Sequence, residues 1–232
     1  MIAALLLLFS CAHTIPPRPQ HLPEDAQVLL DTVDVIAKRR SNQGRQRAAA
    51  AVARAQGLQP AMERIDLWSL QRNLVVELQG ETDQIAYLVA HTDKTDASWP
   101  KLVSLMVNGL FDDIIGWTFL SEGAVDNATG VAVVTQVAAR LAALPSRRYT
   151  WRVLLAGSEE SGLRGTRAHL ARIGADERER VAMALNVDSV GLRYTQNCLL
   201  RPGTSPELAE VALGARGDLP LGLSTAPPGA TS

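Results

Sequence analysis

Four short segments of the sequence combine histidine and acidic side chains in patterns that suit metal binding. They are His91-Thr92-Asp93, the Asp126-Asn127 pair in G-A-V-D-N-A-T-G, the Glu159-Glu160 pair in G-S-E-E-S-G, and Asp188 in N-V-D-S-V-G. One imidazole together with several carboxylates forms a ligand set for borderline or hard divalent cations. These residue types therefore indicate a metal site.

Spacing within two of the segments supports this interpretation. If the chain stays extended, its period of two puts His91 and Asp93 on one side, and a carboxylate commonly orients a ligating imidazole. Glu159 and Glu160 are adjacent acids that repel each other, so placing both at the end of a buried strand is costly unless cations or protons compensate. The sequence therefore predicts that a cation or a proton compensates these acids.

The elements that carry these residues are predicted from hydrophobic periodicity. Strands are expected at Ile85–Ala90, Trp151–Ala156 and Val181–Val187, each running into one of the motifs, and a helix at Val131–Leu144 follows the Asp126 motif. Open α/β sheets place their functional sites at the carboxyl ends of the strands. We therefore expect the four motifs to meet at one edge of a sheet.

The rest of the chain also alternates between strand and helix patterns. Further strands are expected at Met62–Trp68, Asn73–Leu78 and Cys198–Leu200, and further helices from Glu24, at Ala48–Ala55, Arg164–Ile173 and Pro206–Ala215. This alternation predicts a layered α/β domain. The basic cluster from Lys38 to Arg47 is interpreted as a solvated surface without function.

Taken in order, the motifs resemble the co-catalytic zinc aminopeptidases of metallopeptidase family 28. The resemblance runs through H-T-D, G-A-V-D-N-A-T-G, G-S-E-E-S-G-L-R-G and N-V-D-S-V-G and covers about Asn73 to Gly191. It implies a three-layer αβα fold with a mixed, mostly parallel central sheet. It also implies a hydrolase that removes the N-terminal residue of a peptide substrate by means of metal-activated water.

The resemblance assigns a role to each motif residue. It implies zinc as the cofactor, with two ions and the ligands His91, Asp126, Glu160 and Asp188. His91 and Asp188 hold one ion, Glu160 holds the other, and Asp126 bridges them. Glu159 is the general base that deprotonates the metal-bound water, and Asp93 orients His91.

One ligand of the family has no counterpart here. It is a histidine in a late S-D-H segment, whereas the last of the four histidines in this sequence is His169. We expect His169 to lie on a solvated helix face rather than to replace that ligand. We also expect the sequence to be a fragment or a truncated reading frame, with one complete metal position and a weakened second one.

Composition excludes several other classes of protein. The 232 residues are 47% hydrophobic, and 23 basic against 24 acidic side chains give a formal net charge of -1. This balance excludes a nucleic-acid-binding tail and a disordered acidic chain. Two cysteines cannot form a disulfide framework for a chain of this length. No nucleic-acid partner and no obligate protein partner are indicated.

The N-terminus is expected to direct export. The apolar run from Ile2 to Phe9 is far shorter than the roughly 20 residues that span a bilayer, and L-F-S-C resembles a bacterial lipobox, with Cys11 as the acylated first residue of the mature chain. Thr14–Pro23 contains four prolines, which favours an extended tether. We expect a lipid-anchored protein on the periplasmic or extracellular face of the bacterial cell envelope. The predicted parts are a signal peptide at 1–10, a Pro-rich tether at 11–24 and the zinc peptidase-like domain at 25–232.

A second apolar stretch, Leu102–Leu120, contains Asn108, Asp112 and Asp113. Because burying these polar groups in lipid is expensive, the stretch is interpreted as a pocket wall or partner surface rather than a membrane span.

Three functions remain open at this point. The first is a zinc exopeptidase, the second a glutaminyl-cyclase-like acyltransferase with a single zinc ion, and the third an inactive domain that binds metal or peptide. The presence of His91 and of the complete D-N-A-T-G element favours the first function over the second.

Overall fold

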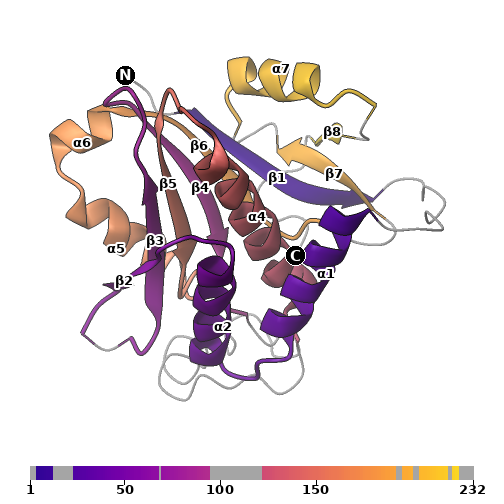
Figure 1. The fold of residues 1–232 in the computed structure, drawn as a ribbon, viewed down its shortest axis with the longest axis vertical. Helices are drawn as coiled ribbons and strands as arrows, with labels where there is room; N and C mark the ends of the chain where they lie inside the picture. The colour runs from indigo at the N-terminus through magenta and orange to yellow at the C-terminus, as the bar shows by residue number, and fades with distance from the viewer. Residues whose placement is uncertain are drawn as a thin grey trace.

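A single mixed β-sheet with helices on both faces forms the centre of the molecule (Figure 1). A computed structural model describes residues 4–12, 23–67, 69–94, 122–191, 195–200, 204–218 and 221–224. The strands are β1 (Ala4–Ala12), β2 (Ala61–Arg64), β3 (Arg72–Leu78), β4 (Ile85–His91), β5 (Thr150–Ala156), β6 (Val181–Val187), β7 (Thr195–Leu200) and β8 (Leu221–Ser224). Their order across the sheet is β2-β3-β5-β4-β6-β1-β7-β8.

The pairing of the strands confirms the predicted fold class. Strand β4 lies parallel to β5 and β6 at the centre, β1 is parallel to β6, and β7 is parallel to β8. The pairs β2-β3, β3-β5 and β1-β7 are antiparallel. Because β4, β5 and β6 run in the same direction, their carboxyl ends, which carry three of the four motifs, lie at one edge of the sheet.

One face of the sheet is covered by three helices that pack on one another. They are α1 (Glu24–Ala37), α2 (Asn42–Ala55) and α4 (Gly130–Ala143). The core beneath them includes Ile36, Leu74, Leu88, Val131 and Val153, each at most 3% exposed. Helix α2 contributes alanines, whose small side chains allow the helix to approach the sheet closely.

The other face carries a smaller apolar cluster. It consists of Ile85, Tyr87, Leu154, Ala156 and Val181, and the helices α5 (Arg164–Arg172) and α6 (Ala175–Glu179) lie on this side. Tyr87 of β4 meets the α5 side chain His169 edge to face. Strand β4 is therefore covered on both faces, as its nearly continuous apolar sequence predicts.

Most predicted elements are present with small shifts at their ends. Strand β6 and helix α7 (Pro206–Ala215) have the predicted bounds. Helix α2 begins at Asn42 rather than Ala48, and β2 ends at Arg64, with Trp68 outside the described residues. The short elements α6 and β8 were not predicted.

The apolar run near the N-terminus lies in the sheet as β1, between β6 and β7. Its backbone pairs in parallel with Met183–Val187 and antiparallel with Thr195–Leu199. Within the described ranges, no helix has the length and apolar character needed to cross a membrane. The stretch Leu102–Leu120 and the residues of the tether from 13 to 22 lie outside the described residues.

Candidate metal centre

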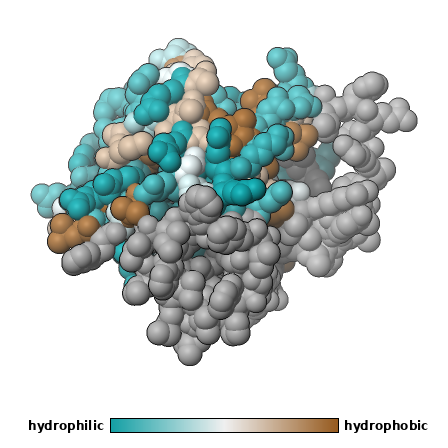
Figure 2. All heavy atoms as spheres, turned by 90° about the horizontal axis from the view of Figure 1, so that it is seen from below, coloured by the Kyte–Doolittle hydropathy of each residue, from teal (hydrophilic) through white to brown (hydrophobic). Residues whose placement is uncertain are grey.

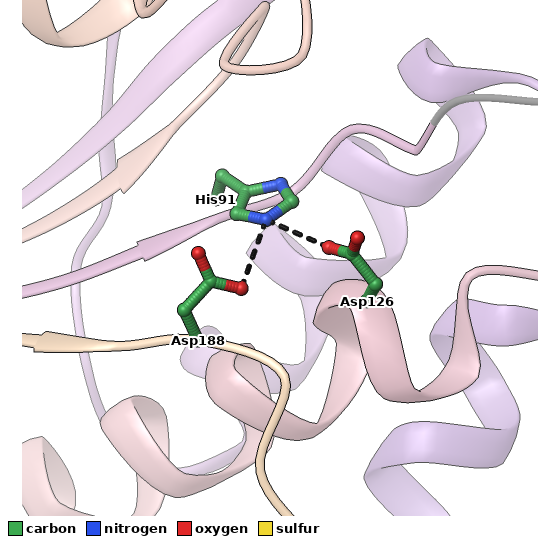
Figure 3. Close-up of side chains that lie close together, drawn as sticks. All are labelled: His91, Asp126 and Asp188. Atoms are coloured by element: carbon green, nitrogen blue, oxygen red, sulfur yellow. Dashed lines mark ion pairs between the residues drawn. The ribbon is translucent and has the colours of Figure 1, made fainter. Parts of the chain in front are cut away.

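Three predicted ligands meet at the edge of the sheet (Figure 3). The His91 Nε2 atom lies 2.9 Å from an Asp126 carboxylate oxygen and 3.4 Å from an Asp188 carboxylate oxygen. His91 ends β4, Asp188 directly follows β6, and Asp126 lies in the irregular turn η2 (Ala124–Thr129) before α4. His91 and Asp188 are almost one hundred positions apart in the sequence, and they meet because β4 and β6 are parallel neighbours in the sheet.

The other nitrogen of the imidazole fixes the orientation of the ring. His91 Nδ1 lies 3.2 Å from the backbone oxygen of Asp93 and 3.6 Å from its carboxylate. When Nδ1 carries the proton and donates it to this backbone oxygen, Nε2 presents its lone pair to the site, as a ligating histidine requires. Asp93 therefore contacts His91 as predicted, but the shorter contact comes from its backbone.

The carboxylate of Asp93 has a second set of partners, which the sequence did not reveal. The backbone N–H of Glu159 donates to one of its oxygens at 3.0 Å, and that of Glu160 donates to the other at 3.1 Å. Asp93 is 1% exposed. One buried carboxylate thus joins the loop after β4 to the loop after β5, and holds both glutamates next to His91.

The turn that carries Asp126 is fixed by its neighbour. The Asn127 side chain is fully buried, donates to the Val187 backbone oxygen at 2.9 Å, and accepts from the N–H groups of Gly130 at 2.9 Å and Ser189 at 3.2 Å. These bonds connect the Asp126 turn to the end of β6, where Asp188 lies. A Cβ on Gly130 would lie 2.2 Å from the Asn127 side-chain oxygen, so only glycine fits here.

Hydrogen bonds to Gln71 and Asn73 hold the start of the Glu159–Glu160 loop. The Ser158 N–H donates to the Gln71 side-chain oxygen at 2.9 Å, and the Gly157 N–H donates to Asn73 at 3.1 Å. Ser158 has a positive φ of 53°, which turns the chain sharply at the end of β5. The two glutamates that follow are half-buried, and each has a ligand atom in a group with His91 whose members lie within 4.8 Å of one another.

Electrostatics at the site favour a bound cation. Burial raises the pKa of Glu159 to about 7, and burial together with the charge of Asp126 raises the pKa of Glu160 to about 8. Burial alone would lower the pKa of His91, but hydrogen bonds to Asp126, Asp188 and Asp93 raise it well above its usual value. Burial would raise the pKa of Asp188, yet its contacts with His91 and Ser189 lower it. Without a metal, the site retains protons in order to limit repulsion among its acids.

The donor set fits a divalent metal such as zinc. His91, Asp126 and Asp188 form one group of three side chains whose ligand atoms lie within 4.8 Å of one another, and His91, Glu159 and Glu160 form another. The Glu160 Oε1 atom is buried and has no hydrogen-bond partner in the described part of the chain. A cation would satisfy this oxygen, because a buried carboxylate oxygen without a partner is costly.

His169 does not lie where it was predicted. It is only 3% exposed, with Nδ1 2.9 Å from Glu63 and Nε2 3.1 Å from the Tyr87 hydroxyl. The prediction of a solvated helix face was wrong because α5 lies on the sheet and buries this side of its second turn. His169 belongs to neither of the metal-binding groups found among the described residues.

The interpretation of the basic cluster also needs correction. Arg45 is fully buried, and its guanidinium contacts the two loops that carry His91 and Asp126. The predicted helix began at Ala48, three residues too late to include Arg45, so nothing in the pattern placed this side chain on an inner face. Its neighbour Arg47 is exposed, as predicted.

Figure 2 views the molecule from the lower side of Figure 1, where the carboxyl ends of the central strands lie. Hydrophilic side chains predominate on the described part of this face, and hydrophobic ones gather in smaller patches between them.

Comparison with known proteins agrees with this geometry. The family model for peptidase family M28 matches residues 73–217, which is well over half of the chain and includes all four motifs. The chain belongs to peptidase family M28. The family resemblance inferred from the four sequence motifs is thereby confirmed. Curated protein sequences gave no match to this M28 chain.

Solved structures share the fold of this M28 chain. BSAP, a zinc aminopeptidase from Bacillus subtilis, is 24% identical in sequence, and its structure superposes with a TM-score of 0.51. The match covers 66% of this chain and 34% of the BSAP chain. LapA from Legionella pneumophila is 12% identical with a TM-score of 0.63, and the match covers 93% of this chain and 63% of the LapA chain. A glutaminyl cyclase from Tannerella forsythia is 16% identical with a TM-score of 0.52, and the match covers 72% of this chain and 62% of the cyclase chain. The M28 chain thus spans between one third and just under two thirds of these proteins.

Proposed function

We propose that this M28 chain is a zinc-dependent aminopeptidase that hydrolyses the N-terminal bond of a peptide. The observation that carries the proposal is the convergence of two groups of ligand side chains on His91, from three strand ends and one turn. Similarity in fold to BSAP and to the LapA aminopeptidase supports the choice of an exopeptidase. We propose two zinc ions, one with His91, Asp126 and Asp188, the other with Asp126 and Glu160.

Bound between these carboxylates, zinc would polarise the scissile carbonyl and lower the pKa of a water molecule toward neutrality. The chain itself supplies the proton transfer. A Glu159 carboxylate oxygen takes the proton of the attacking water and passes it to the nitrogen of the leaving amine. Its backbone N–H bond to Asp93 fixes the start of this side chain, and its burial brings its pKa close to neutral.

The variant Glu159→Gln tests this role. It keeps the shape of the side chain and all metal ligands but removes the group that accepts the proton. We expect unchanged zinc content and a kcat lower by about 10²- to 10⁴-fold, measured on aminoacyl chromogenic substrates. Glu179→Gln, an exposed position on α6, is the matched control and should have wild-type kcat. A Glu159→Gln variant with more than a tenth of wild-type kcat would refute the assignment.

A glutaminyl cyclase is the second candidate, because such enzymes occur among the structures of similar fold. The two activities differ in their products, since a cyclase releases ammonia from an N-terminal glutaminyl peptide and leaves the peptide bond intact. Mass spectrometry of a Gln-Ala-Ala peptide therefore distinguishes them. We expect loss of the N-terminal residue; a loss of 17 mass units would favour the cyclase.

We also propose that the chain is exported and acylated on Cys11, on the basis of its N-terminal sequence. Cleavage before Cys11 would remove most of β1, which pairs with β6 and β7. Edman or mass-spectrometric sequencing of the mature protein distinguishes the alternatives: a lipid-modified N-terminus at Cys11 supports the proposal, whereas a retained Met1–Ser10 segment refutes it.

A further inference from the structure

Arg45 of helix α2 occupies a position between the two loops that carry the proposed ligands. Its Nε donates to the Thr92 backbone oxygen at 2.7 Å, Nη1 to that of Glu122 at 2.8 Å, and Nη2 to that of Gly123 at 2.9 Å. Thr92 directly follows His91, and Gly123 precedes Asp126 by three positions. One side chain thus links the backbone beside His91 to the backbone leading into Asp126.

The chemistry of these contacts requires a guanidinium group. Three donors in one plane point at three carbonyl oxygens from two chain segments 30 positions apart. A lysine ammonium is a single point of charge and cannot bridge both segments with the same fixed geometry. Gly123 has a φ of +57°, and a Cβ there would lie 2.7 Å from Lys94 Cβ and 2.8 Å from the Asp126 backbone oxygen. It would also lie 3.0 Å from Arg45 Nη1. Glycine at this position therefore lets the guanidinium, the Lys94 side chain and the Asp126 turn pack closely together.

Asn42, one helical turn earlier, fixes the same loop by a second pair of bonds. Its side-chain amide donates to the Lys94 backbone oxygen at 3.3 Å and its side-chain oxygen accepts from the Lys94 N–H at 3.1 Å. Asn42 is 1% exposed, and the helix start is capped by the Ser41 hydroxyl, which accepts from the Gly44 N–H. The first turn of α2 is thus connected to Thr92 within the His91–Asp93 segment and to Lys94 directly after it.

Burying a cation here is costly, so its presence needs a compensating role. Burial lowers the pKa of Arg45 to about 10, opposed by the charges of Asp93, Asp126 and Glu160. The side chain remains charged at neutral pH. Its cost is offset by three charge-assisted hydrogen bonds and by the nearby acids.

We propose that Arg45 is a positioning residue of the metal centre: it sets the separation of the His91 loop and the Asp126 turn, so that both ligands are in place before a metal binds. This inference rests on the proposed role of His91 and Asp126 as zinc ligands. In this role Arg45 acts through its bonds to backbone oxygens and not by binding zinc or substrate.

The test is a zinc titration of the full chain against a chromophoric chelator, with wild type, Arg45→Lys and Arg45→Met. Partners that orient metal ligands typically contribute about 10- to 100-fold in affinity. We expect this loss in both variants, because lysine keeps the charge but not the planar set of donors. If Arg45→Lys binds zinc as tightly as wild type, the inference is overturned, whether or not Arg45→Met is weaker.

Two controls separate positioning from general stability. Arg47→Lys changes an exposed arginine on the same helix and should bind zinc like wild type. Ile85→Ala, at the opposite end of β4, lowers stability without touching the site. With cobalt as probe, the visible absorption spectrum of Ile85→Ala should match wild type, whereas that of Arg45→Lys should change. Identical spectra for wild type and Arg45→Lys would overturn the inference.

If the Arg45 variants fail to fold, amide hydrogen exchange of the wild-type chain decides. Because Arg45 holds the two segments in place before a metal binds, the peptides that contain Thr92 and Gly123 should be equally protected with and without zinc. Protection of these peptides that rises about tenfold or more on zinc binding overturns the inference. A wild-type chain that binds no zinc or cobalt would refute the proposed function itself, which is a different result from equal binding by wild type and variants.

Discussion

The stability of the metal-free protein should fall as pH rises from about 4.5 to 8. Glu159 has a pKa near 7 in the folded chain against 4.5 as its ordinary value, because it is buried. A group with a raised pKa in the folded state holds more protons there than in the unfolded state. Its stabilising contribution is complete below pH 4.5 and is lost as pH rises through 7. Glu160 and His91, whose pKa values are also raised, act in the same direction.

The magnitude follows from Glu159 alone. A rise from 4.5 to about 7 corresponds to about 3 kcal/mol at 1.36 kcal/mol for each pH unit. For a chain of this size, 1 kcal/mol changes Tm by roughly 2–4 °C. We therefore expect the Tm of the metal-free protein to drop by roughly 10 °C between pH 4.5 and 8. Asp188, whose pKa is lowered, stays ionised across this window and affects stability only at lower pH.

Differential scanning calorimetry of chelator-treated protein measures this effect. The variant Glu159→Gln should show a shallower pH dependence, whereas Glu179→Gln should keep the wild-type slope. Saturating zinc should remove most of the dependence, because the cation takes over the role of the protons. A metal-free Tm that is constant or increases from pH 4.5 to 8 would refute the view that burial raises the pKa of these acids in the metal-free site.

Two further substitutions test how the loops of the site are held. Asn127→Ala removes a buried amide that bonds to the Val187 backbone oxygen and to two N–H groups. It should lower the free energy of unfolding, measured in urea titrations, by about 3 kcal/mol. A change below about 1 kcal/mol would contradict the role of this side chain in holding the loops. Gly165→Ala places a Cβ 2.1 Å from the Gly157 backbone oxygen and should cost about 2 kcal/mol. Gly174→Ala, with nothing within 4 Å of its Cβ, should be neutral by the same measurement; equal losses in both would show that the close approach is unimportant.

Much of the fold follows from local pattern. The run I-A-Y-L-V-A predicts a strand covered on both faces, and β4 is buried as expected because apolar residues at every position suit such a strand. Helix α7 and strand β6 have their predicted bounds. Helix α2 was placed too late, since the polar sequence N-Q-G-R-Q before its alanines shows no apolar periodicity. Its polar residues face inward because they bond to loops that only the folded chain brings near.

The same division applies to the metal centre. The sequence by itself determined which residues are the candidate ligands, because histidine and acids placed directly after apolar strands are costly to bury there unless they bind something. Only the tertiary structure decided how those side chains meet: the parallel arrangement of β4, β5 and β6 places their ends together, and Asp93, Asn127 and Arg45 link the loops by hydrogen bonds to backbone atoms. Every residue offers the same N–H and C=O groups, so such bonds leave no periodic trace in a sequence, and they become visible only once the chain is folded.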